Sequence, residues 1–130
     1  MNNLIREIPL TNGLTVCFYD ATRRYFGDYH QVRIKISCQV PLSPGLFDDA
    51  QAFEAAVKLL GGKVLYQKEI EQQGVPTLAV SDAVEKVISQ FIENSLAYFD
   101  NDAFPRRFVQ SEMNRVLTRA KAFVPLHANG

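Results

Sequence analysis

The sequence predicts an α+β fold, with an antiparallel sheet of about four strands and three helices in the order β-β-β-α-β-α-α. Three observations lead to this prediction. An Asn12-Gly13 pair separates two apolar stretches, residues 32–40 alternate between apolar and polar, and apolar residues recur at helical spacing after residue 82. Together they indicate a sheet with helices packed on one of its faces.

The first two strands are expected at residues 4–10 and 14–19. Asn-Gly suits the positive φ angles of a type I′ turn, which joins two antiparallel strands through a two-residue loop. Such a turn places Ile8 opposite Cys17 and Leu10 opposite Thr15. We therefore expect a tight β-hairpin at the N-terminus.

The third strand has the clearest pattern in the chain. Five apolar residues alternate with polar ones, which is typical of a strand with one buried and one solvated face. The apolar residues are Val32, Ile34, Ile36, Cys38 and Val40. With the hairpin before it, this strand predicts a three-stranded antiparallel meander over residues 4–40.

A helix is expected over residues 48–60, ended by Gly61-Gly62, and a further strand over residues 63–71. The next helix begins at Asp82, which forms a capping-box pattern with Glu85, and ends before residues 100–102. The last helix carries Pro105 in its first turn. Because a short link joins these two helices, we expect them to pack as an antiparallel hairpin.

The chain of 130 residues suits one globular domain over 1–130, with a loose tail from about residue 124. No apolar run approaches the roughly 20 residues that cross a bilayer, and the N-terminus lacks a secretory pattern. We therefore expect a cytoplasmic protein with no membrane contact, in which Cys17 and Cys38 are thiols. Nothing in the sequence calls for a metal or a cofactor.

The net charge is zero, but the charges are unevenly distributed. Residues 46–102 carry four basic and ten acidic residues, whereas residues 103–130 carry five basic and one acidic. The neutral total argues against a general nucleic-acid binder. An acidic middle and a basic end can attract each other between two copies. This distribution favours a homodimer or a protein partner.

The link between the second and third strands, over residues 20–33, is long and rich in arginine and aromatic residues. Paired guanidinium groups can hold a phosphate or carboxylate, and aromatic rings can stack on a flat ligand. In the structural alternative, the aromatic residues fold back over the sheet while Asp20 and Asp28 neutralise the arginines. The candidate ligand-binding residues are Arg23, Arg24, Tyr25, Tyr29, His30 and Arg33.

The last helix presents a second candidate surface, formed by Arg107, Arg115 and Arg119. A basic amphipathic helix can bind an acidic partner or a phosphate backbone. It can also face the preceding helix, which carries Asp82, Glu85 and Glu93. We favour this structural interpretation, because surface charges contribute small energies.

No catalytic constellation emerges from the sequence, so a noncatalytic role is favoured over an enzyme. The leading hypothesis is a protein-interaction or regulatory module that self-associates. The alternative is a domain that binds a small anion or nucleotide through residues 20–33. An enzyme that uses His30 as acid or base ranks third, and nucleic-acid binding through the last helix ranks fourth.

Overall fold

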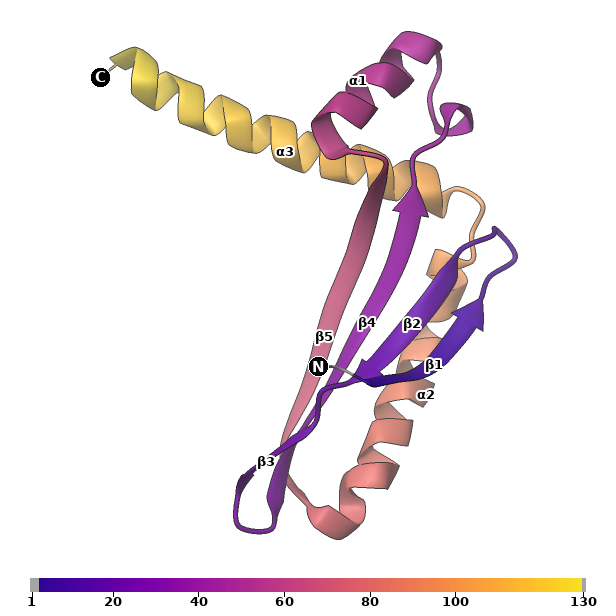
Figure 1. Cartoon of the computed structure of the whole chain (residues 1–130), viewed down its shortest axis with the longest axis vertical. Coiled ribbons are helices and arrows are strands. Elements are labelled where there is room, and N and C mark those ends of the chain that lie inside the picture. The colour runs from indigo at the N-terminus through magenta and orange to yellow at the C-terminus, as the bar shows by residue number, and fades with distance from the viewer. Residues whose placement is uncertain (1–2, 130) are drawn as a thin grey trace. The chain divides into compact units, whose positions relative to one another are not determined.

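The computed structural model describes the backbone of residues 3–129 and the side chains of residues 3–120. It contains one antiparallel sheet of five strands and three α-helices (Figure 1). The predicted fold class and order of elements are confirmed. The elements are β1 (Asn3–Pro9), β2 (Thr15–Asp20), β3 (Arg23–Phe26), β4 (Tyr29–Pro41), α1 (Ala50–Leu60), β5 (Lys63–Pro76), α2 (Val80–Phe99) and α3 (Phe104–Asn129).

Contacts divide the chain into two compact units, each made of two separate segments. Unit 1 comprises residues 1–39 and 65–101, and unit 2 comprises residues 40–64 and 102–130. Unit 1 holds most of the sheet and α2, while unit 2 holds α1 and α3. The single domain that we expected over residues 1–130 stays a prediction.

The strand β4 is the centre of the sheet. The strands β2 and β3 follow one another along one edge of β4, β5 pairs with its other edge, and β1 lies outside β2. The expectation of a long loop over residues 20–33 is therefore wrong. After Asp20 the chain stays attached to β4, because Ala21 donates to the Arg33 carbonyl and Thr22 accepts from the Arg33 N–H. The turn between β3 and β4 is tight, and Gly27 supplies its positive φ of 52°.

The turn between β1 and β2 contains three residues rather than the two that we predicted. Leu10 donates to the Leu14 carbonyl at 2.7 Å, and Ile8 lies opposite Val16 rather than Cys17. Gly13 has a φ of 87°, as expected where a three-residue loop ends in a left-handed residue. The register is therefore shifted by one residue from the predicted one.

A contact with α2 explains this longer turn. The Asn12 side-chain N–H₂ donates to the Phe99 carbonyl at 2.7 Å, and its Oδ1 accepts from the Leu14 N–H at 3.1 Å. Thr11 donates through both its N–H and its hydroxyl to Asp100. The turn thereby satisfies carbonyl groups at the C-terminal end of α2, which have no partner within the helix.

The core of unit 1 lies between the sheet and α2. The alternation predicted for β4 is confirmed, since its five apolar residues are buried and the residues between them are mostly not. From α2, Val84, Val87, Ile88, Phe91 and Phe99 are buried. Phe91 meets Phe18 of β2 edge to face, with ring centroids 5.6 Å apart.

The start of α2 differs from the predicted capping box. The helix begins at Val80, and its N-cap residue Ala79 offers no side-chain hydrogen bond. Thr77, just before, donates to Asp28 at the tip of the β3–β4 turn, which fixes the chain and lets the helix begin early. Asp82 therefore lies inside the first turn, and Glu85 pairs with Arg6 at 3.0 Å.

In unit 2, α1 packs against α3. The Asp49 side chain caps α1 by accepting from the Ala52 N–H, and Gly61 ends the helix as predicted. Arg106 of α3 holds the segment before α1, donating to the Leu46 carbonyl at 3.0 Å and to Asp48. The partner described for α3 is thus α1, and the expected hairpin of α2 with α3 stays a prediction.

The backbone of α3 continues to Asn129, through the stretch from residue 124 for which we expected a loose tail. Pro105 lies in the first turn of this helix, as the sequence predicted. His127 lies outside the residues whose side chains are described.

Candidate functional site

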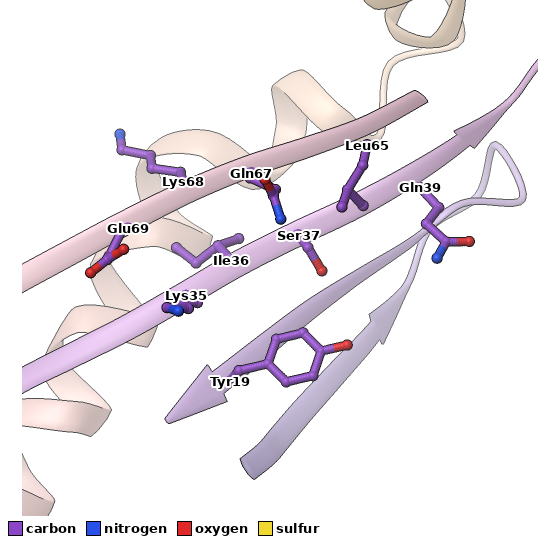
Figure 2. Close-up of a pocket in the computed structure, with 9 residues that line it drawn as sticks. All are labelled: Tyr19, Lys35, Ile36, Ser37, Gln39, Leu65, Gln67, Lys68 and Glu69. Atoms are coloured by element: carbon purple, nitrogen blue, oxygen red, sulfur yellow. The ribbon is translucent and has the colours of Figure 1, made fainter. Parts of the chain in front are cut away.

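The face of the sheet opposite α2 is the main candidate site, and we call it the open face. Side chains alternate along a strand, so the odd-numbered residues of β4 point away from the buried core. Odd-numbered residues of β5 continue this face (Figure 2). Together they line a shallow hollow of about 700 Å³, whose open-face residues are Tyr19, Lys35, Ser37, Gln39, Leu65, Gln67 and Glu69.

A charged network extends the open face toward the β3–β4 hairpin. Arg33 forms ion pairs with Glu69 and, at 3.3 Å, with Glu71. Gln31 donates to Glu71 at 3.2 Å and accepts from Arg23 at 3.0 Å. The Arg33 hydrogen bond lowers the pKa of the Glu69 carboxyl below its ordinary value. The network therefore neutralises its own charges.

The structure separates the six residues predicted to bind a ligand. Arg23 and Arg33 belong to the open-face network. Arg24 and His30 lie directly opposite each other on the hairpin. Each is one residue away from the pair Arg23 and Gln31, so both side chains lie on the face of the sheet opposite the open face. Tyr25 lies exposed at a bulge, and Tyr29 lies exposed beside the turn.

The surroundings of His30 do not resemble an acid–base site. Its Nδ1 atom is buried and makes no hydrogen bond to the described residues. Asp28, the carboxylate nearest in sequence, accepts from the Thr77 hydroxyl instead.

The three arginines predicted to form a basic surface are all exposed on α3. Arg115 pairs with Glu112 of the same helix at 2.7 Å. Glu85, one of the acidic residues expected to face this helix, pairs with Arg6 instead. Arg107 and Arg119 stay candidates for contact with a partner.

The two cysteines lie on opposite faces of the sheet. Cys38 is buried opposite Val16, whereas Cys17, one residue further along, lies half-buried on the open face. Burial, with a smaller contribution from Cys17, raises the pKa of the Cys38 thiol to about 11. Burial and Glu7 raise the pKa of Cys17. Both thiols are therefore weak nucleophiles at neutral pH.

Two smaller hollows lie along the boundary between β5 and α2, outside the open face. One of about 250 Å³ is bordered by Ile70 of β5 and Phe91 of α2. The other, of about 280 Å³, is bordered by Val75 and Ala83. Both leave apolar surface accessible beside β5.

Sequence reasoning missed the part that β5 contributes to the open face. The sequence did contain a signal for this, namely the inward-facing apolar residues of β5, which are Val64, Tyr66 and Ile70. Because side chains alternate along a strand, the odd-numbered residues beside them must face outward. That set is Leu65, Gln67, Glu69 and Glu71. The sequence did not reveal that two of these glutamates meet Arg33, because 36 residues separate Arg33 from Glu69.

No family model, curated protein or solved structure matches this chain. Over the residues that the structure describes, no three His, Cys, Asp or Glu side chains gather at a point that would hold a metal ion. In the same part of the chain, none of the helices has the length and apolarity needed to cross a membrane.

Proposed function

We propose that this chain is a noncatalytic protein-interaction module that self-associates. The observation that carries the proposal is the uneven cover of the sheet. The helix α2 covers one face of the sheet, while among the described residues of unit 1 no element covers the open face or pairs with the outer edge of β5. An uncovered strand edge is a template for another strand.

The chemistry of the open face supports a protein partner more than a small ligand. Its hollow is shallow and mixes the Lys35 and Glu69 charges with uncharged polar groups and the apolar Leu65. Small-molecule sites enclose most of their ligand in a deep, mainly apolar cleft. A broad polar surface with both signs of charge suits a complementary protein surface better.

Light scattering over a range of concentrations tests self-association. We expect the mass to rise with concentration from the 14.7 kDa of one chain toward twice that value. High salt should shift this equilibrium, because it screens exposed charges. A mass that stays at one chain at every concentration would contradict the proposal.

A second candidate function, the binding of a small anion, rests on the juxtaposition of Arg24 and His30. The two residues are directly opposite on the hairpin, and the Arg24 side chain is exposed. A guanidinium beside an imidazole can hold a phosphate. Calorimetric titration with inorganic phosphate should give a signal that Arg24→Ala removes and Arg107→Ala retains. Equal signals for both variants would remove this candidate.

A further inference from the structure

The strand β5 offers the longest regular edge of the sheet. It runs for 14 residues and, among the described residues, pairs only with β4 (Figure 1). The strands β1 and β3 are shorter, and a register shift interrupts the pairing of each. Bulges and short lengths protect a sheet edge from other chains. The strand β5 is longer than either, and over residues 63–73 it contains neither proline nor glycine.

Resting on the proposed function, we propose that the partner is a second copy of this chain, joined antiparallel along β5. In this dimer the two Gln67 residues lie opposite each other on a two-fold axis perpendicular to the sheet. The two five-stranded sheets then form one continuous sheet, and both α2 helices lie on the same face of it.

Symmetry allows only half of the conceivable registers. A two-fold axis perpendicular to the sheet keeps each side chain on the same face in both copies. Because side chains alternate between faces along a strand, two opposed residues lie on the same face only if an even number of positions separates them. One residue of β5 must therefore lie opposite itself. A register centred on Lys68, Glu69 or Glu71 places like charges directly opposite, which destabilises a strand pair. A register centred on Ile70 places Glu69 opposite Glu71.

Centring the pair on Gln67 avoids every like-charge pair. Lys63 of one copy then lies opposite Glu71 of the other, and the two-fold axis repeats this pair of opposite charges. On the helix side, Val64 lies opposite Ile70, so apolar residues meet on both sides of the axis. Centring on Leu65 or Tyr66 also avoids like charges, but pairs only five or seven residues of each strand, whereas the Gln67 register pairs nine. Centring on Gln72 or Gln73 avoids like charges too, but the paired segment then includes Gly74, with its φ of 67°, and Pro76, which has no N–H to donate.

The surroundings of β5 fit an added strand. Ile70 is half-buried, and the hollow of about 250 Å³ that it borders lies between β5 and α2. The apolar side chains of an added strand would cover this accessible surface. On the open face, Gln67 is exposed within the larger hollow. The helix side of the edge is thus mainly apolar, with Lys68 as the exception, and the open face is mainly polar, with Leu65 as the exception.

Disulfide trapping tests the register directly. A Gln67→Cys variant, made with Cys17→Ser, should form a disulfide-linked dimer on mild oxidation, seen on a non-reducing gel. Opposed residues of antiparallel strands have Cα atoms about 4.5–5.5 Å apart, which suits a disulfide. The matched control is Gln73→Cys on the same strand, whose two copies would lie roughly 40 Å apart and should not link.

A charge variant provides a second readout that does not depend on oxidation. Gln67→Lys places two positive charges opposite each other, and should weaken dimerisation at least about tenfold in light scattering. Gln73→Lys adds the same charge outside the paired segment, and should leave the mass unchanged. Circular dichroism of both variants should match that of the wild type, because both side chains are exposed.

The outcomes separate this inference from the proposed function. Suppose that the chain self-associates, but Gln67→Cys forms no disulfide-linked dimer and Gln67→Lys does not weaken dimerisation. This result would overturn the β5 interface and leave the proposal of self-association intact. A link through Gln73→Cys would overturn the Gln67 register. A chain that remains a monomer at all concentrations would overturn both proposals.

Discussion

Replacing Asn12 with alanine tests the tie between the N-terminal turn and α2. The Asn12 side chain makes two well-formed hydrogen bonds, at 2.7 Å to the Phe99 carbonyl and at 3.1 Å from the Leu14 N–H. A third, at 3.3 Å to the Asn101 carbonyl, is longer and exposed. At about 1 kcal/mol for each of the first two bonds, Asn12→Ala should lower the free energy of unfolding by about 2 kcal/mol.

Urea unfolding followed by circular dichroism measures this loss. Asn94→Ala is the matched control, because Asn94 is exposed on α2 and alanine favours a helix, so its stability should be unchanged or slightly higher. Asn12→Asp keeps the acceptor for Leu14 but loses the donors and adds a negative charge at the helix C-terminus, so most of the loss should persist. A change of less than about 0.5 kcal/mol in Asn12→Ala would refute the reasoning.

Three further predictions concern the core, the open face and the buried thiol. Phe91→Ala should lower the free energy of unfolding by about 3–5 kcal/mol, because Phe91 is buried against Phe18. Leu78→Ala is the control, since the Leu78 side chain is 97% exposed, and it should change the free energy of unfolding by less than about 0.5 kcal/mol. Arg33→Met should raise the pKa of the Glu69 carboxyl toward its ordinary value in an NMR titration, while Arg24→Met leaves that pKa unchanged. An unchanged Glu69 pKa in Arg33→Met would contradict the ion pair. Because the Cys38 pKa is raised from 9.0 to about 11 in the folded chain, its contribution to stability is complete below pH 9.0 and is lost as the pH rises toward 11. Urea unfolding from about pH 8 to about pH 10.5 should therefore show a steeper loss for the wild type than for Cys38→Ala, and parallel losses would count against this assignment.

The sequence predicted those parts of the fold that leave a local pattern, such as the regular spacing of apolar residues on a buried face. In β4, the two-residue alternation of Val32 through Val40 matches the buried face residue for residue. The end of α1 was also predictable, because Gly61 adopts a φ of 87° that other residues rarely adopt. Such signals are local, and they do not depend on what lies elsewhere in the chain.

The strand β3 and the N-terminal register were not predictable for physical reasons. All four residues of β3 are exposed, so no apolar period marks it as a strand. The register of the first hairpin depends on the bond from Asn12 to Phe99, whose residues are 87 positions apart. Local turn propensity favoured two loop residues, and a distant helix end selected three.

The candidate site was also predicted only in part. The sequence identified Arg23 and Arg33 as unusual, and both lie in the open-face network. The sequence prediction assigned them to one loop together with Arg24 and His30. In the structure the alternation of side chains along the strands places Arg24 and His30 on the opposite face of the sheet. A loop was expected because residues 20–33 lack apolar periodicity, yet hydrogen bonds to β4, from both the backbone and side chains, keep residues 20–26 extended.

The bond between Asn12 and Phe99 also bears on how the chain folds as it is made. At roughly 5–20 residues per second, synthesis of the 87 positions between them takes about 4–17 s. During that interval the turn is complete in sequence but lacks its carbonyl acceptors, and the sheet lacks the helix that covers its apolar face. Unit 1 therefore closes only after translation has passed residue 101, although its hairpin is among the first segments synthesised.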